Sequence, residues 1–139
     1  MSDRDQEIIN GLRRGYEAFN RADFDAVMEL VHPEIELVRA GGQSSLRGAD
    51  AVRAWMEPDA LEDQRMEPLE FRVNGDKVLV HQNVRARGAG SGIELDVDAW
   101  VVWTFDDDGL VTRLEAFLDQ ESEALNAAGF SESDRQRQT

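Results

Sequence analysis

The sequence predicts an α+β protein in which helices cover one face of an antiparallel sheet. Two observations predict this class. Apolar segments of alternating pattern follow one another from Phe71 to Asp119 and are separated by short turns. Segments with an apolar residue at every third or fourth position occur only before residue 62 and after Asp119. Because a sheet with one buried face needs a covering layer, we expect these helices to supply it.

Two helices are predicted at the start of the chain. Ser2 is placed to cap the first, over residues 3–20, whose apolar residues recur at helical spacing: Ile8, Ile9, Leu12, Tyr16 and Phe19. Asp23 is placed to cap a second, shorter helix, which Pro33 would end. The apolar residues of this second helix are Phe24, Val27, Met28 and Val31.

A short strand and a third helix are predicted next. Ile35 and Leu37 point to the same side of a strand over residues 35–39. A loop of small residues, 40–45, then leads to a helix over residues 49–56. The inner face of this helix would carry Val52, Trp55 and Met56.

The strands from Phe71 onward are predicted to form a twisted antiparallel meander. The chain reverses at residues 74–76, 88–92 and 106–109, where asparagine, aspartate and glycine provide the turn conformations. The acidic stretch before the meander, residues 59–67, has no regular apolar spacing. We therefore expect a mobile connection there.

The end of the chain is predicted to hold one more helix. Residues 120–128 form it, with Gly129 as its C-terminal cap and Phe130 folding back. Residues 131–139 contain no apolar residue and are predicted to be a disordered tail. At this length we expect a single domain, residues 1–139, with a core of about residues 5–125.

Composition and charge exclude several classes of function. The formal net charge is −14 and no basic stripe offsets it, so we expect no binding of nucleic acid. No apolar run approaches the ~20 residues of a membrane span, and the charged first residues form no signal sequence. These features predict a cytoplasmic protein without a membrane partner. The chain has no cysteine and two distant histidines, so no metal site is predicted.

Short motifs occur along the chain in a characteristic order. They are Tyr16-x-Ala18-Phe19-Asn20, Asp23-Phe24-Asp25, Leu46-Arg47-Gly48, and Phe105 followed by Asp108-Gly109-Leu110-Val111. With these motifs, and over about residues 5–125, the chain resembles the SnoaL-like branch of the nuclear transport factor 2-like (NTF2-like) superfamily.

The resemblance implies a cone, in which a curved and mostly antiparallel sheet wraps an apolar pocket roofed by three N-terminal helices. It also implies a homodimer packed through the sheet, and a site that works without a cofactor. The superfamily includes isomerases, dehydratases, cyclases, epoxide hydrolases and proteins with no chemistry. The fold therefore does not by itself define the function.

The resemblance also implies which side chains face the pocket. It places Trp103 and Phe105 inward, and strand alternation then sends Val97, Ala99 and Val101 the same way. On the neighbouring strands the inward residues would be Leu79, His81, Asn83, Arg85, Arg113, Glu115, Phe117 and Asp119.

This orientation leaves the more apolar row of one strand outside. The row consists of Val78, Val80, Val84 and Ala86. A half-buried strand normally turns its valines to the core, so either this row packs against a second subunit or the orientation is wrong. Because the family pairs through this sheet, we expect the row to lie in a dimer interface.

His81, Glu115 and Asp119 are the candidate catalytic residues. A mid-strand imidazole can exchange a proton near neutral pH when a carboxylate orients it. Each residue also has a structural interpretation. His81 can instead satisfy a buried polar network. Glu115 can form an ion pair with Arg85 or Arg113. Asp119 can cap the helix that follows it.

Tyr16 is a candidate hydrogen-bond donor to a ligand carbonyl, or a core aromatic residue. The other candidate ligand-binding residues supply an apolar wall or a polar end: Phe19, Trp55, Met56, Trp103, Phe117, Asn83, Arg85 and Arg113. The wall of a ligand pocket is also the core of a small cone, so both roles can hold together.

Two well-defined activities of the superfamily are not expected. Ketosteroid isomerases use a tyrosine, a base and an acid, and the matching positions here hold Gly15, Val38 and Val101. Limonene-type epoxide hydrolases need an arginine two positions from an aspartate on a strand. Asp96 and Asp98 have no such arginine neighbour.

The sequence thus predicts a protein with a pocket for a small, apolar, oxygenated molecule. One hypothesis is a cofactor-independent isomerase, cyclase, dehydratase or hydrolase that transfers protons. The other is a non-catalytic ligand-binding or accessory protein with the same fold.

Overall fold

The computed structural model describes residues 3–38, 45–56, 61–118 and 128–129. Its elements, in chain order, are α1 (Asp3–Asn20), α2 (Phe24–Met28), β1 (Val31–Val38), β2 (Ser45–Arg47), α3 (Ala49–Met56), β3 (Leu61–Asn74), β4 (Lys77–Gly88), β5 (Glu94–Phe105) and β6 (Val111–Leu118).

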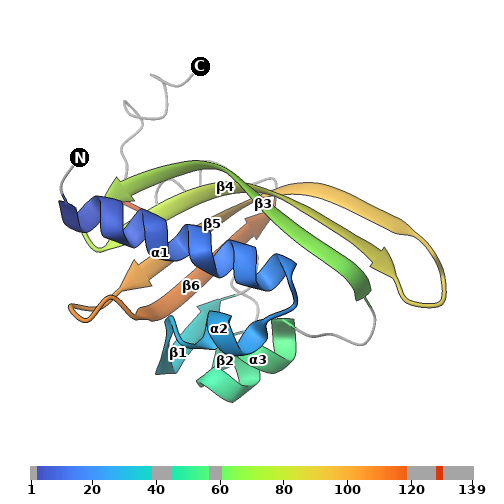
Figure 1. Cartoon of the computed structure of the whole chain (residues 1–139), viewed down its shortest axis with the longest axis horizontal. Helices are drawn as coiled ribbons and strands as arrows, with labels where there is room; N and C mark the ends of the chain where they lie inside the picture. The colour runs from blue at the N-terminus through green and yellow to red at the C-terminus, as the bar shows by residue number, and fades with distance from the viewer. Residues whose placement is uncertain (1–2, 39–44, 57–60, 119–127, 130–139) are drawn as a thin grey trace.

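The strands form one curved sheet in the order β2-β1-β6-β5-β4-β3. The pair β1–β6 is parallel, and the other neighbouring pairs are antiparallel. Helix α1 crosses one face of the sheet, while α2 and α3 lie beside β1 and β2 (Figure 1). The arrangement is the predicted α+β cone, with an unclosed sheet and three N-terminal helices.

Helix α1 forms where its apolar spacing predicts it. Six of its side chains are buried: Ile8, Ile9, Leu12, Tyr16, Ala18 and Phe19. At its end the amide of Asn20 makes two hydrogen bonds to the backbone of Met66 in β3, at 2.9 and 2.8 Å. These bonds attach the helix to the edge of the sheet. The predicted cap Ser2 lies outside the described residues.

Helix α2 is shorter than predicted, because β1 begins before Pro33. Asp23 caps the helix as predicted, with its Oδ1 accepting from the Ala26 N–H at 3.3 Å. The ladder between β1 and β6 is irregular from Val31 to Glu36, so Pro33 breaks no regular pairing there. Helix α3 has the predicted bounds, and β2 is an additional outer strand.

The predicted mobile connection over residues 59–67 is wrong for its described part, since residues 61–67 belong to strand β3. This strand forms the edge of the sheet and pairs with β4 on one side only. It has two register shifts, at Glu62/Arg65 and Pro68/Glu70, and Asp63 has a positive φ of 53°. An edge strand tolerates proline and bulges because its outer groups need no partner strand.

The predicted hairpin reversals are confirmed. Gly75 and Gly109 adopt positive φ of 65° and 83°, a conformation that glycine adopts without strain. Antiparallel ladders connect β3, β4, β5 and β6 in sequence. The meander therefore forms four of the six strands of the sheet from consecutive segments of the chain.

The two faces of the sheet carry different side chains. We call the face toward α1 the inner face, formed on β4–β6 by Val78, Val80, Gln82, Val84, Val97, Ala99, Val101, Trp103, Phe105, Leu114 and Ala116. We call the opposite face the outer face, formed there by Leu79, His81, Asn83, Arg85, Trp100, Val102, Arg113, Glu115 and Phe117.

The predicted orientation was correct for β5 and wrong for β4 and β6. Directly paired residues of antiparallel strands point to the same face. Val78 pairs with Trp103 and Val80 pairs with Val101, so the valine row lies beside the inward residues of β5. The expectation that this row forms a dimer interface is therefore wrong, because it forms part of the core beneath α1.

The remaining predictions concern the end of the chain. Asp119, most of the predicted helix 120–128, and residues 131–139 lie outside the described residues. Gly129 has a positive φ of 87°, as a helix cap requires, and Ala128 is fully buried against Leu79 and Val102 on the outer face. Among the helices that the structure describes, none is long and apolar enough to cross a membrane.

Candidate ligand-binding cavity

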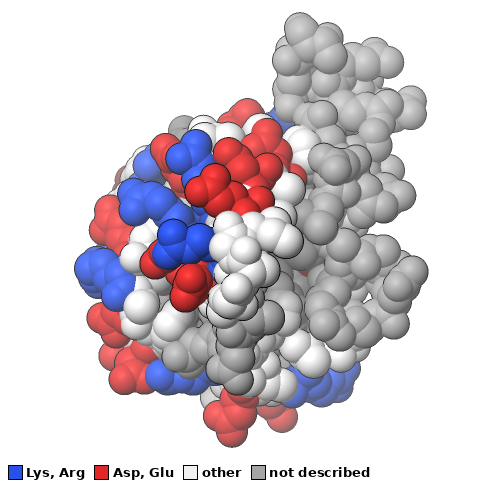
Figure 2. Space-filling model, turned by 90° about the vertical axis from the view of Figure 1, so that its right-hand side faces the viewer, with Lys and Arg blue, Asp and Glu red and all other residues white. Residues whose placement is uncertain are grey.

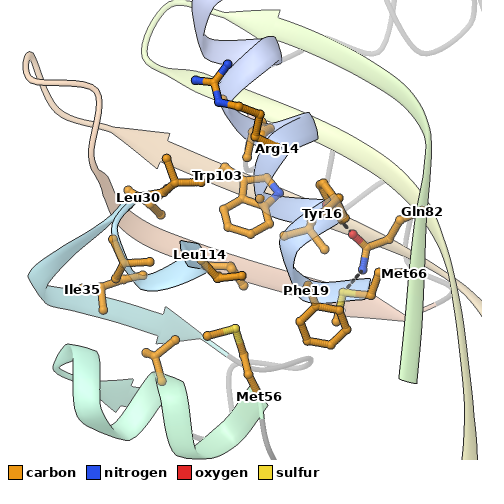
Figure 3. A pocket seen from close by; sticks show the side chains of 18 of the residues that line it. Arg14, Tyr16, Phe19, Leu30, Ile35, Met56, Met66, Gln82, Trp103 and Leu114 are labelled. Carbon is orange, nitrogen blue, oxygen red and sulfur yellow. Dashed lines mark hydrogen bonds between the residues drawn. The ribbon is translucent and has the colours of Figure 1, made fainter. Parts of the chain in front are cut away.

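A cavity of about 850 Å³ lies between α1, the inner face of the sheet and α3 (Figure 3). Its size falls in the usual range for sites that bind small molecules. The apolar side chains that form its wall include Ile8, Leu12, Phe19, Leu30, Ile35, Val52, Trp55, Met56, Val84, Val97, Val101, Trp103, Leu114 and Ala116. An apolar molecule of moderate size therefore has both the space and the surroundings that it needs.

Five of the predicted binding residues line this cavity. They are Tyr16, Phe19, Trp55, Met56 and Trp103. Tyr16 packs edge-on against Trp103, with ring centroids 6.0 Å apart, and against Phe71 at 6.4 Å. Such edge-to-face pairs hold aromatic rings in fixed positions. Their part in binding a ligand stays a prediction.

Two buried polar side chains of the described lining meet at one place in the wall. The Tyr16 hydroxyl donates a hydrogen bond to Oε1 of Gln82, and Nε2 of Gln82 donates to the Met66 sulfur at 3.6 Å (Figure 3). Gln82 is 4% exposed and is the only polar or charged side chain classed as buried among the described residues. The three side chains come from α1, β4 and β3, so they join the helix to two strands.

Burial affects the chemistry of this polar group. It raises the pKa of the Tyr16 hydroxyl well above its ordinary value, while the nearby Trp103 indole lowers it slightly. The indole N–H lies near the Tyr16 hydroxyl without forming a well-aligned hydrogen bond, since Nε1 of Trp103 is buried and has no partner among the described residues. Tyr16 thus stays protonated at neutral pH and acts as a donor.

Every charged residue of the described cavity lining is exposed to solvent. These are Arg4, Glu7 and Arg14 on α1, and Asp107 and Asp108 in the turn between β5 and β6. Two glycines of α1 shape the same region. A Cβ at Gly15 would lie 3.0 Å from a methyl carbon of Leu30, whereas one at Gly11 would meet only the end of Arg14 at 3.8 Å. Gly15 therefore allows α1 to approach Leu30 closely.

The predicted catalytic residues His81 and Glu115 lie on the outer face, away from the cavity. The His81 ring stacks on Trp100, with centroids 4.7 Å apart and planes 3° from parallel. Its Nε2 lies 3.4 Å from a carboxylate oxygen of Asp98, but it forms no hydrogen bond to a described residue. Glu115 pairs with Arg113 at 3.3 Å, and Arg113 also approaches Glu36 at 3.7 Å.

Four predicted binding residues also lie on the outer face: Asn83, Arg85, Arg113 and Phe117. Their predicted orientation toward the pocket is wrong, for the pairing reason given above. Asn83 donates to Asp96 at 2.7 Å and to Asp98 at 3.2 Å, and Arg85 approaches Asp96 at 3.7 Å. The structure therefore gives His81, Glu115 and these four residues no geometric basis for a role in the cavity.

Gln82 is the buried polar residue of the cavity that the sequence interpretation missed. A signal for it exists, because the amide interrupts an apolar row at two-residue spacing: Val78, Val80, Gln82 and Val84. A polar residue within a row that faces the core must find a partner or serve a function. The orientation implied by the resemblance put this row on the outer face, where a polar residue is ordinary.

The surface near the end of the β4–β5 hairpin carries charges of both signs side by side (Figure 2). Arg87 pairs there with Glu62 at 3.2 Å and with Asp63, and Arg85 faces Asp96. Exposed pairs of this kind contribute little to stability. No group of three or more potential metal ligands occurs in the described parts of the chain.

Comparison with known families gives one match. A family model described as a SnoaL-like domain matches residues 12–114. No curated protein matches the chain in sequence.

Solved structures resemble the fold. SalBIII, an epoxide hydrolase/cyclase-like enzyme in pyran ring formation in polyether salinomycin, is 18% identical with a TM-score of 0.76, over 87% of this chain and 96% of its own. An NTF2-like protein of unknown function from Burkholderia pseudomallei is 23% identical with a TM-score of 0.73, over 93% of this chain and 99% of its own. TerC, crystallised with polyporic acid, is 24% identical with a TM-score of 0.70, and the match covers 84% of this chain and 94% of TerC. At these identities the likeness concerns the fold.

Proposed function

Since this chain belongs to the SnoaL-like domain family, we propose that it binds a small, largely apolar, oxygenated molecule in the cavity beneath α1. The cavity itself is the observation that carries this proposal. Its wall is largely apolar, its volume of about 850 Å³ suits a small molecule, and the buried side chains of Tyr16 and Gln82 place polar atoms in that wall.

Binding without turnover is the function that this interior supports best. General acid–base catalysis needs a group that changes protonation near the working pH. Every carboxylate of the described cavity lining is exposed, and no histidine lines it. Among the buried lining residues that the structure describes, Tyr16 is the only ionisable one, and burial moves its pKa further from neutrality. We therefore assign the protein the role of a ligand carrier, sensor or accessory protein.

A cofactor-independent enzyme is the second candidate, and the Tyr16 hydroxyl favours it. A buried donor beside an apolar cavity can stabilise negative charge that develops on a substrate oxygen. The base for an isomerase, cyclase, dehydratase or hydrolase would then come from Asp107 or Asp108 in the β5–β6 turn, or from Asp119 outside the described residues. The similarity in fold to a cyclase-like enzyme agrees with this candidate.

The two candidates predict different outcomes for a bound molecule. Native mass spectrometry of protein purified from its own host should show one retained small molecule per cavity. That molecule should be recovered chemically unchanged after incubation with fresh protein, as judged by liquid chromatography and mass spectrometry. Conversion of the recovered molecule to a product would contradict the binding role and support the enzyme. Failure to retain any apolar molecule would contradict the binding role.

The partner protein is proposed to be a second copy of the chain, packed through the sheet. Because the valine row belongs to the core, such a dimer would use the outer face, where Trp100 and Phe117 remain partly exposed. Sedimentation velocity should then give the mass of a dimer at micromolar concentration. A monomer at all concentrations would exclude this arrangement.

A further inference from the structure

The Gln82 amide has an environment that few polar side chains share. It lies in the middle of β4, between Val80 and Val84 on the inner face, and it is 4% exposed. A buried amide has two N–H donors and one carbonyl acceptor to satisfy. Leaving such a group unpaired costs about 1–3 kcal/mol. The partners that Gln82 has therefore show which of its donors and acceptors still need a hydrogen bond.

The orientation of the amide follows from its neighbours. The Tyr16 hydroxyl donates to Oε1, and the Met66 sulfur accepts from Nε2 at 3.6 Å. Because a thioether can only accept, it fixes the NH₂ end of the amide on its own side. A sulfur atom is a weak acceptor, so the acceptor end of Gln82 is well satisfied and the donor end is not.

A second donor of the surrounding wall also lacks a strong partner. Nε1 of Trp103 is buried without a partner among the described residues, and its indole influences the Tyr16 hydroxyl. A molecule that adds a hydrogen-bond acceptor could satisfy these donors, whereas a molecule that adds only donors could not.

The interior disfavours a charged acceptor. Each charged residue of the described lining is exposed, so none is buried beside Gln82 to neutralise an anion. Burial raises the pKa of the Tyr16 hydroxyl, which shows that negative charge is poorly stabilised at this point of the wall. The same penalty would apply to a carboxylate carried by a ligand.

We propose that the Gln82 amide determines which ligands the cavity accepts, by donating from Nε2 to a neutral carbonyl oxygen such as that of a ketone, quinone or lactone. In this assignment Tyr16 is a positioning residue, because its hydroxyl holds the amide with its donor end free of strong partners. The Met66 sulfur, which accepts from Nε2 at 3.6 Å, is the weak partner that a ligand oxygen would replace. The assignment rests on the function proposed above.

Three naphthalene compounds with side groups of similar size test the assignment: methyl naphthyl ketone, ethylnaphthalene and naphthoate. Isothermal titration calorimetry measures the dissociation constant of each with the full chain. We expect the ketone to bind about fivefold tighter than ethylnaphthalene, which is the effect of one neutral hydrogen bond. We expect naphthoate to bind at least about tenfold more weakly than the ketone.

A pair of variants on one strand identifies the amide responsible. Gln82→Met keeps the length of the side chain and removes its donor, so the preference for the ketone should fall to within about twofold. Asn83→Leu removes the next amide along β4, which lies on the outer face beside Asp96 and Asp98, and should leave the preference unchanged. Circular dichroism verifies that both variants fold.

The possible outcomes separate this assignment from the function on which it rests. If none of the three compounds binds the wild-type protein, the proposed function fails. If all three bind the wild type with equal affinity, the function stands and the role of Gln82 is refuted, whether or not the variants fold. Retention of the full ketone preference in Gln82→Met would also refute it.

Discussion

Gln82 and Asn83 are neighbours on β4 and carry the same amide group, but the two faces of the sheet give them different chemistry. The Gln82 amide lies in an apolar wall with a hydroxyl and a sulfur as partners. The Asn83 amide lies on the outer face beside the carboxylates of Asp96 and Asp98. The outer face therefore holds most ionisable groups of this region, while the inner face holds the space for a ligand. Reactive residue types alone do not locate a site.

The largest contrast between the faces is expected in stability. Val80 is fully buried on the inner face, so Val80→Ala should lower the free energy of unfolding by about 2 kcal/mol through lost burial and a new cavity. Arg85→Ala removes an exposed ion pair on the outer face of the same strand and should cost less than about 1 kcal/mol. Urea denaturation measures both values. Equal losses of unfolding free energy in the two variants would show that the two faces contribute equally to stability.

A smaller contrast is expected in ligand affinity. Ala116 of β6 is partly buried and lines the cavity, so the ring of Ala116→Phe should occupy ligand space and weaken the binding of methyl naphthyl ketone about tenfold. His81→Ala on the outer face should change this affinity by less than about twofold. Calorimetric titration of the two variants provides the test. If His81→Ala lost as much affinity as Ala116→Phe, the imidazole would have to take part in ligand binding.

The smallest contrast concerns the pH dependence of stability. Tyr16→Phe removes the partner of the Gln82 carbonyl and should cost about 1 kcal/mol at neutral pH. Burial raises the pKa of Tyr16 above its ordinary value of 10.0, so the folded state binds the phenolic proton more tightly than the unfolded state. The resulting stabilisation is complete below about pH 10 and is lost as the pH rises through the pKa of the folded state.

The wild type should therefore lose stability above about pH 10 more steeply than Tyr16→Phe does. Urea denaturation at a series of alkaline pH values compares the two proteins. The other titrating groups contribute equally to the pH dependence of both proteins, so the difference between the two profiles is the contribution of Tyr16. Parallel profiles would mean that the hydroxyl is less buried than its surroundings indicate.

Local patterns made the helices and the meander predictable from the sequence. Helix α1 has a continuous apolar stripe, and the reversals at Gly75 and Gly109 follow asparagine or aspartate residues that favour turns. The first half of β3 was not predictable in this way. Its residues 61–67 are mostly polar, and a distant residue, Asn20, holds its backbone to α1.

The faces of β4 and β6 were predictable in principle from their apolar residues, although the family resemblance implied the opposite orientation. A shift of one residue in register reverses every side chain of a strand. The alternation of Val78 and Val80 alone indicates the inner face, as their pairing with Trp103 and Val101 confirms. The cavity could not be predicted from any local pattern, because it depends on contacts between distant segments, such as Gly15 with Leu30.

The parallel pair β1–β6 has a consequence for biosynthesis. Val31 pairs with Val111, so the strand beside α3 obtains this partner only after most of the chain has left the ribosome. The hairpins of β3, β4 and β5 join neighbouring segments and can form earlier. During translation the protein is therefore expected to pass through a half-open form, whose apolar interior is accessible to any hydrophobic molecule nearby until β6 arrives.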